Sequence, residues 1–197
     1  MHSALNPIPT PEDTIVRYRL DARASRFRAQ AFAAGLLAAF GHNPMIAIRD
    51  FSGEAVFDPN SLEQSSLKVT INSDSLEVDD DVSAKDREEI LQTMNNDVLE
   101  IEKYSEIHYE SKSVRGRPAG EGRFQIVVSG NLSLHGITRP LDITAFLIVN
   151  GDDCRASGEF VVSQSDYKIK PPSAVGGGLK VKDQVKCSFD IVARKMG

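Results

Sequence analysis

The sequence predicts a mainly β fold, an eight-stranded antiparallel barrel with a short helical insert at about residues 83–104. Polar and apolar residues alternate with a period of two over most of the chain, turn residues separate the alternating segments, and one stretch alone has helical spacing. A length of 197 residues suits one domain. We therefore expect a flexible, proline-containing N-terminal arm over residues 1–13 and a single barrel domain over residues 14–197.

The alternating segments are the predicted strands. In chain order they are Thr14–Leu20, Arg26–Ala34, Met45–Phe57, Leu67–Val78, Ile107–Val114, Arg123–Leu134, Leu141–Val149, Arg155–Ser163 and Val185–Arg194. Turn residues lie between them at Asp58-Pro59-Asn60, Gly116 to Gly122, His135-Gly136 and Asn150 to Asp153. Eight or nine strands match a closed barrel with an extra terminal or edge strand, and a ten-residue strand spans about 33 Å, a natural length for tilted barrel strands.

The helical segment begins at Ser83, where Asp86 three residues later gives a start that resembles a capping box. Apolar residues then recur at helical spacing, from Ile90 to Ile101. Because Asn95-Asn96-Asp97 is a poor helix interior, we expect two short helices with a break there. Their apolar face should pack on the barrel across one end.

The alternation also predicts which side chains face the interior, since the polar set must meet water. Several inward positions carry small residues, which either leave volume for an apolar ligand or lie where two walls approach closely; the pattern leaves both interpretations open. The predicted lining residues are Phe27, Ala29, Ala31, Phe51, Phe57, Ile126, Val128, Leu132, Leu134, Ala145, Leu147, Gly158, Phe160 and Phe189. His42 follows an apolar stretch and is a further candidate, at the mouth, for contact with a polar head group, with loop capping as the alternative.

Several classes of function are disfavoured. A net charge of −5 with scattered Lys and Arg argues against nucleic acid, and no run is long and apolar enough for a membrane span. We predict no metal site, no catalytic residues and no cofactor: the histidines occupy different turns and strands, and there is no serine elbow. The acidic run Glu77–Asp81 is expected to be a solvated turn before the helix. Residues Pro171–Lys180 are expected to form a mobile loop between the last strands, and a lid over the barrel is one role that such a loop can have.

The start of the chain has no signal-peptide pattern, so we expect a cytoplasmic protein. Cys154 and Cys187 fit two reduced thiols in that compartment, although spacing leaves a disulfide between neighbouring strands open.

Short segments of the chain resemble the YceI family of polyisoprenoid-binding proteins from about Tyr18 onward. The segments that carry the resemblance are Tyr18–Asp21 with Ser25–Phe27, Phe40–Pro44, Phe51–Glu54, Lys85–Leu91, Val98–Tyr104 with Ile107–Ser111, Gly130–Leu141, Ser163–Ile169 and Lys180–Val185. The resemblance implies a lipocalin-like barrel that encloses a long isoprenoid chain in an apolar tunnel, often as a homodimer. The chain departs from the family at Val98-Leu99, where paired phenylalanines are usual, and at Ser105-Glu106, where a proline is usual; many relatives also carry export signals.

The apolar lining predicts a non-enzymatic lipid-binding protein, and the resemblance implies that it is bacterial and sequesters or carries a long-chain isoprenoid or similar amphiphile, such as a polyprenyl or quinone lipid. Two alternatives stay open. One is an enzyme acting on a hydrophobic substrate at the barrel mouth, with His42 or the pair Asp86 and Arg87. The other is a ligand-free interaction module, which predicts a solid barrel and an exposed apolar patch.

Overall fold

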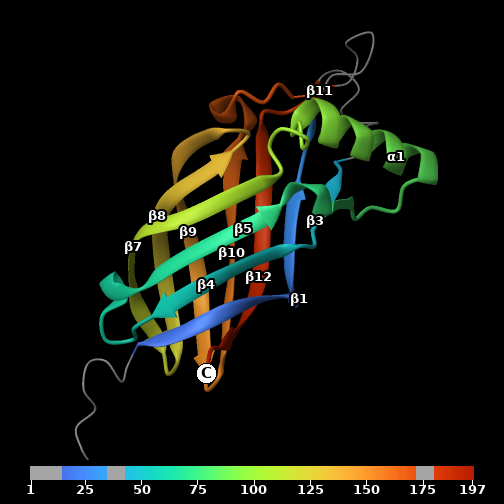
Figure 1. Cartoon of the computed structure of the whole chain (residues 1–197). Helices are drawn as coiled ribbons and strands as arrows, with labels where there is room; N and C mark the ends of the chain where they lie inside the picture. The colour runs from blue at the N-terminus through green and yellow to red at the C-terminus, as the bar shows by residue number, and fades with distance from the viewer. Residues whose placement is uncertain (1–14, 35–42, 172–179) are drawn as a thin grey trace, which may run out of the picture.

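The computed structural model describes residues 15–34, 43–171 and 180–197, and these form an elongated antiparallel barrel (Figure 1). Within the described residues, eight long strands make its wall. They are β1 (Val16–Gln30), β4 (Phe51–Phe57), β5 (Ser66–Asn72), β7 (Glu106–Gly120), β8 (Arg123–Leu134), β9 (Ile137–Asn150), β10 (Asp153–Ser163) and β12 (Gln184–Lys195). The predicted fold class is confirmed.

The barrel closes where its first and last strands pair. Each wall strand pairs with its neighbour in the order β1-β4-β5-β7-β8-β9-β10-β12, and β12 pairs again with β1, from Tyr18 opposite Lys195 to Gln30 opposite Lys186. Two short strands, β3 (Met45–Ile48) and β6 (Leu76–Val78), extend the sheet beside the upper half of β1. Another pair, β2 (Ala33–Ala34) and β11 (Lys180–Val181), forms a separate two-stranded sheet.

The prediction of two separate strands, Thr14–Leu20 and Arg26–Ala34, is wrong, because the single strand β1 includes most of both segments. Its pairing with β12 continues through a bulge between Asp21 and Arg26, where the ladder shifts register. The Ser25 hydroxyl donates to the Asp21 carbonyl at 2.6 Å and accepts from the Val192 amide at 2.9 Å. A side chain therefore bridges the disrupted ladder, so that residues which look like a turn in the sequence stay within one bent strand.

Other strand bounds also differ from the prediction. The segments predicted as single strands over Met45–Phe57 and Leu67–Val78 are each divided by a short turn, into β3 and β4 and into β5 and β6. The predicted turn from Gly116 to Gly122 begins later, because β7 pairs with β8 as far as Gly120. The turn at His135-Gly136 is confirmed, with φ angles of 51° and 72° that suit a tight hairpin.

The helical insert is one continuous segment instead of two helices with a break. Helix α1 (Ala84–Gln92) runs directly into the π-helical segment η4 (Thr93–Val98), and the Ser83 hydroxyl caps its start by accepting from the Asp86 amide. As predicted, the segment lies at one end of the barrel (Figure 1). There Ile90, Leu91 and Met94 pack against a buried cluster formed by Ile46, Ile48, Phe51, Ile71, Leu76 and Val78.

The N-terminal arm predicted over residues 1–13 lies outside the described residues, as do His42 and most of the predicted loop over Pro171–Lys180. Among the described residues, no helix has the length and apolar character needed to cross a membrane.

Candidate functional site

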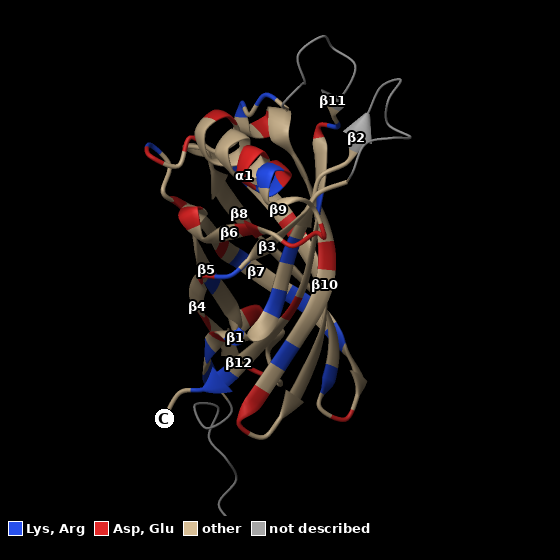
Figure 2. Ribbon diagram, turned by 90° about the vertical axis from the view of Figure 1, so that its right-hand side faces the viewer, with Lys and Arg blue, Asp and Glu red and all other residues tan. Residues whose placement is uncertain are grey.

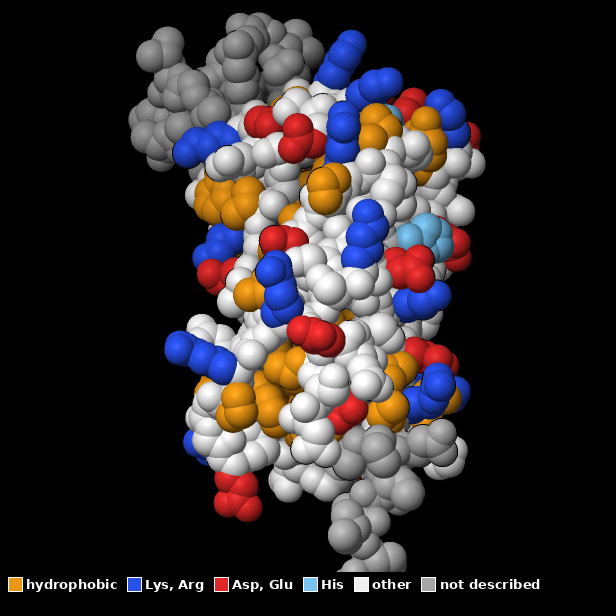
Figure 3. Space-filling view, turned by 90° about the vertical axis from the view of Figure 1, so that its left-hand side faces the viewer, with side chains coloured by type: hydrophobic (Ala, Val, Ile, Leu, Met, Phe, Trp, Pro, Cys, Tyr) orange, Lys and Arg blue, Asp and Glu red, His pale blue; other side chains and the backbone are white. Residues whose placement is uncertain are grey.

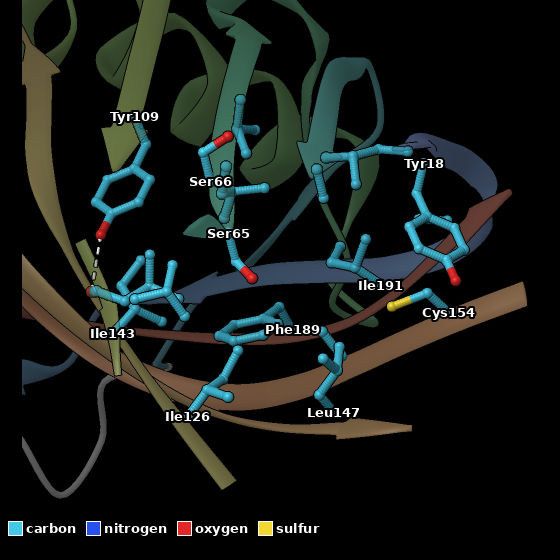
Figure 4. Close-up of a pocket in the computed structure, with 18 of the residues that line it drawn as sticks. Tyr18, Ser65, Ser66, Tyr109, Ile126, Ile143, Leu147, Cys154, Phe189 and Ile191 are labelled. Atoms are coloured by element: carbon cyan, nitrogen blue, oxygen red, sulfur yellow. Dashed lines mark hydrogen bonds between the residues drawn. The ribbon is translucent and has the colours of Figure 1, made fainter. Parts of the chain in front are cut away.

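The interior of the barrel holds a cavity of about 180 Å³ lined almost entirely by apolar side chains from all eight wall strands (Figure 4). An apolar cavity of about 150 Å³ is enough to hold a benzene molecule. Ser65 and Ser66, before and at the start of β5, also line the cavity, and Ser66 is exposed. These two serines directly follow the short 3-10 turn η2 (Leu62–Gln64).

Nine of the fourteen predicted lining residues border this cavity: Phe27, Phe51, Phe57, Ile126, Val128, Leu132, Leu147, Phe160 and Phe189. Five do not. Ala29, Leu134 and Ala145 pack within the core, Gly158 lies against a phenylalanine ring, and Ala31 lies beyond the end of β1 with its amide on the Pro44 carbonyl at 3.1 Å. His42, the candidate at the mouth, falls outside the described residues.

Gly158 does not leave empty space for a ligand, because the Phe189 ring occupies its place. A Cβ atom at Gly158 would lie 2.8 Å from Cζ of Phe189. Gly130 makes room for the Tyr109 ring in the same way, at 2.7 Å from its hydroxyl, and Gly53 for Leu20 at 2.8 Å. At these three glycines, therefore, the small residue lies where two walls of the barrel pack closely, and it does not leave volume for a ligand. The cavity lies elsewhere along the lumen.

Phenylalanine rings surround the Phe27 side chain at one end of the cavity. The Phe27 centroid lies 6.0 Å from that of Phe51, 6.3 Å from Phe160 and 6.5 Å from Phe189. A second edge-to-face pair joins Phe57 and Phe124 at 5.1 Å. These offset and edge-to-face arrangements are the favoured packings of aromatic rings, so the rings form an ordered apolar wall.

Two tyrosines that were not among the predicted site residues also line the cavity, Tyr18 and Tyr109. The Tyr109 hydroxyl lies 3.0 Å from the Val128 carbonyl and 3.1 Å from the Leu141 carbonyl (Figure 4). Desolvation by burial, with a smaller effect of the Asp142 charge, raises the pKa of Tyr109 to about 12. The alternation Tyr18-Arg19-Leu20 and Ile107-His108-Tyr109 was a signal that would have found both residues.

The two cysteines are buried and too far apart to form a disulfide. Cys154 lies opposite Ala193, whereas Cys187 lies opposite Phe160, six residues further along β10. At ~3.3 Å per residue this separation is about 20 Å, against the roughly 7 Å within which a disulfide forms. Desolvation raises the pKa of each thiol to about 12. Cys154 lines the cavity as a neutral apolar side chain.

Outside the cavity, His135 joins three segments at the helix-covered end of the barrel. Its Nδ1 lies 3.2 Å from the Tyr167 carbonyl, its Nε2 lies 2.7 Å from Oε2 of Glu100, and its ring lies tilted against that of Tyr104 with the centroids 4.5 Å apart. Among the described non-glycine residues, positive φ occurs at Glu100 and His135, which take part in this contact, and at Lys168, which follows Tyr167. These contacts show that His135 connects neighbouring segments of the fold, which the sequence pattern did not indicate.

The remaining polar candidates are held by structural contacts. His108 is exposed beside Thr70 and Glu106. The acidic run Glu77–Asp81 is only partly the predicted turn, because its first two residues belong to β6. Glu77 pairs with Arg49 at 3.1 Å and Asp79 with Arg28 at 2.8 Å, so ion pairs connect the run to its neighbours. No group of three or more His, Cys, Asp or Glu side chains that could hold a metal ion occurs in the part of the chain that the structure describes.

The pair proposed for an enzymatic mouth also has structural roles. Arg87 donates to the backbone carbonyls of Val78 and Asp80, and the Asp86 amide is part of the helix cap. Neither residue lines the apolar cavity. The described residues around the cavity therefore supply an apolar, almost uncharged space closed by aromatic rings.

A family model described as a YceI-like domain matches residues 18–193. A UPF0312 protein of Shewanella oneidensis is 29% identical over 127 residues, and the match covers 61% of each chain. The match therefore spans about three-fifths of the length of that curated relative. Among solved structures, Burkholderia cenocepacia BcnA has a TM-score of 0.68 at 20% identity, covering 88% of this chain and 98% of its own. A polyisoprenoid binding domain from Saccharophagus degradans, implicated in plant cell wall breakdown, has a TM-score of 0.66 at 14% identity, covering 92% and 99%.

Proposed function

Because the chain belongs to the YceI-like family, we propose that it binds the apolar chain of an isoprenoid or similar long-chain amphiphile in its barrel and sequesters or carries that lipid. The observation that carries this proposal is the apolar cavity enclosed by the eight wall strands. The similarity in fold to a solved polyisoprenoid binding domain supports it.

The hydrophobic effect supplies the driving force. Burying roughly 400 Å² of apolar lipid surface at ~25 cal/mol per Å² contributes about 10 kcal/mol before the costs of association and ordering. Such binding requires no exact set of polar contacts. An almost uniformly apolar lining is what a protein that recognises a hydrocarbon chain needs.

The cavity is small for a long chain, which bears on how the lipid enters. At about 180 Å³ it is close in size to a cavity that holds one benzene molecule. A polyprenyl chain therefore fits only if lining side chains move, and the ring cluster around Phe27 occupies much of the adjacent lumen. We propose that these rings change rotamer as the lipid enters.

The proposed action is binding and not catalysis. The described residues that line the cavity include no Asp, Glu, His, Lys or Arg, and the titratable groups among them are tyrosines and Cys154. An enzyme for a hydrophobic substrate would need a titratable pair that converges on the pocket. The rival role as an interaction module has only limited support, because the exposed large hydrophobic side chains among the described residues are few: Ile15, the neighbouring Phe146 and Ile148 on β9, and Val161 on β10.

Two finer parts of the proposal are a cytoplasmic location and a homodimer. The cytoplasmic location is supported by the two cysteines, which are both free thiols and lie too far apart to form a disulfide with each other. Free thiols are usual in a reducing compartment. The homodimer is inferred from the family resemblance. Cell fractionation and sedimentation equilibrium measure these two properties.

The test of the proposed function is to identify what the protein carries. We expect an organic extract of protein purified from its native host to contain a stoichiometric polyprenyl, quinone or similar long-chain lipid, measured by mass spectrometry. The extracted protein, refolded and checked by circular dichroism, should take up an added prenol. An empty extract from folded protein that also takes up no added prenol would overturn the proposal.

A further inference from the structure

Tyr18 is the largest fully buried side chain among the described residues, with 1% of its surface exposed. It lies on β1 and faces the lumen, where it lines the cavity together with Cys154 and Ala193. Figure 4 shows its hydroxyl group beside the Cys154 side chain. A polar group therefore lies in a cavity whose lining is otherwise almost entirely apolar.

The Tyr18 hydroxyl makes no hydrogen bond to any other described residue, and its recorded interactions are electrostatic ones with Cys154 and Asp152. Tyr109, the other tyrosine of the cavity, differs in this respect because its hydroxyl lies between two backbone carbonyls. Buried tyrosine hydroxyls normally have a partner, since an unsatisfied one is costly. The missing partner of Tyr18 points to a group that enters the cavity from outside the chain.

The surroundings restrict the chemistry of that partner. Desolvation, followed by the nearby Cys154 and Asp152, raises the pKa of Tyr18, so that the phenol is a neutral hydrogen-bond donor at physiological pH. Among the described residues that line the cavity there is no Lys, Arg or His to balance an anion. A buried diphosphate would therefore be uncompensated, whereas a neutral hydroxyl or carbonyl oxygen would satisfy the donor.

We propose that Tyr18 anchors the bound lipid by donating a hydrogen bond to a neutral hydroxyl or carbonyl oxygen at the buried end of the ligand. This inference rests on the proposed lipid-binding function and adds to it the orientation and the head-group class. The ligand lies with its oxygen-bearing end against Tyr18, and the rest of its chain contacts the apolar lining. Tyr18 is then a positioning and specificity residue, and the apolar contacts supply most of the affinity.

The experiment compares two ligands of similar chain on two proteins. Delipidated wild type and Tyr18→Phe are titrated with radiolabelled farnesol, and farnesene, a hydrocarbon without the oxygen, is measured as a competitor. Tyr18→Phe should weaken farnesol binding about 3- to 10-fold, the range expected for one hydrogen bond, and leave farnesene binding unchanged. Urea denaturation of the lipid-free variant should show stability equal to or above wild type, because the substitution removes an unsatisfied group.

Tyr109→Phe is the matched control, because it removes the same atom from a hydroxyl that already has backbone partners. It should lower stability and change the affinities for both ligands by the same factor. Equal effects of Tyr18→Phe on farnesol and farnesene, or tighter binding of farnesyl diphosphate than of farnesol, would overturn the inference while lipid binding stands. If folded wild type binds neither farnesol nor farnesene, the proposed function fails and the inference fails with it.

Discussion

The two cysteine side chains show how burial determines chemistry at the scale of a residue. Both thiols are buried, and desolvation raises the pKa of each from 9.0 to about 12. The thiolate is the reactive form, so at pH 8 only about one part in ten thousand of each thiol is ionised. Cys154 and Cys187 therefore act as small apolar side chains that complete the core.

We expect native protein to resist alkylation by iodoacetamide at pH 8, while both cysteines react once the chain is unfolded in urea. Because the thiol pKa is raised in the folded protein, each thiol stays neutral until the pH approaches about 12, and moderately alkaline pH does not activate it. Intact-mass spectrometry counts the adducts. Rapid modification of Cys154 alone in folded protein would contradict the expectation and show that the cavity admits polar reagents.

Of the predicted lining residues, the phenylalanines all border the cavity, whereas the alanines and Gly158 do not; Leu134 is the one large side chain that packs in the core instead. The alternation placed Phe27, Phe160 and Phe189 in the lumen, because a large apolar side chain on an inward position must contribute to the lining. At Gly158 the pattern left two interpretations open, free volume or closely packed walls, because a glycine does not reveal whether a neighbouring side chain fills the space beside it; Phe189 does so. Cross-strand register decides this, and register is not visible in one strand.

At the scale of elements, the helical insert contains an unusual buried group. In the π-helical segment η4, Oδ1 of Asn95 is fully buried and has no hydrogen-bond partner. The amides of Leu99 and Ile101 donate to the carbonyls of Met94 and Asn95, five and six residues back, so the segment is wound more widely than an α-helix. The local sequence Asn95-Asn96-Asp97 thus widens the helix where a break was expected.

Asn95→Leu should leave the fold intact and stabilise it by on the order of 1 kcal/mol, because it replaces an unsatisfied buried acceptor with an apolar group of similar size. Urea denaturation followed by circular dichroism gives the free energy of unfolding. Asn96→Leu, at the exposed neighbouring position, is the control and should change stability by less than about 0.5 kcal/mol. A clear loss of stability in Asn95→Leu would instead indicate that the amide oxygen has a partner, such as an ordered water molecule.

The strand prediction was accurate in the hairpins and less so where long-range pairing overrides a local signal. The turn at His135-Gly136 was predictable because its residues suit positive φ. In β1, by contrast, Ser25 bonds to Val192 at the other end of the chain, and this contact keeps residues 22–25 within the strand. No local pattern contains that information, so the sequence indicated two strands.

The closure of the barrel is a property of the whole molecule, since it depends on the pairing of the first and last strands. Along this seam and beside it, charges of both signs alternate on the outer surface (Figure 2), whereas the opposite face carries scattered charges with apolar groups between them (Figure 3). Beside the seam, Arg155 of β10 bonds to Asp190 of β12 at 2.6 Å, and Arg194 of β12 bonds to Asp153 of β10 at 2.6 Å. Arg194 also reaches Asp21 of β1 across the seam at 3.5 Å. The pairing of β10 with β12 places the first two pairs of opposite charges next to each other.

The Arg155–Asp190 pair is expected to make a small, pH-dependent contribution to the stability of the β10–β12 pairing. The hydrogen bond from Arg155 lowers the pKa of Asp190 below its usual 3.8. A lowered folded pKa means that the contribution is fully present above the unfolded value and is lost as the pH falls through the folded value. Because both side chains are partly exposed, solvent screening keeps the contribution small.

Arg155→Gln should therefore lower the free energy of unfolding only slightly at pH 7, and the difference from wild type should shrink as the pH falls below about 4 or as salt rises to about 1 M. Urea titrations at pH 7, 5 and 3 measure this. Arg123→Gln is a matched control, since Arg123 forms no ion pair with another described residue, and it should show no such pH dependence. A difference between Arg155→Gln and wild type that persists unchanged at pH 3 would mean that Arg155 supports the β10–β12 pairing through packing of its side chain and not through its charge, because protonated Asp190 no longer attracts it.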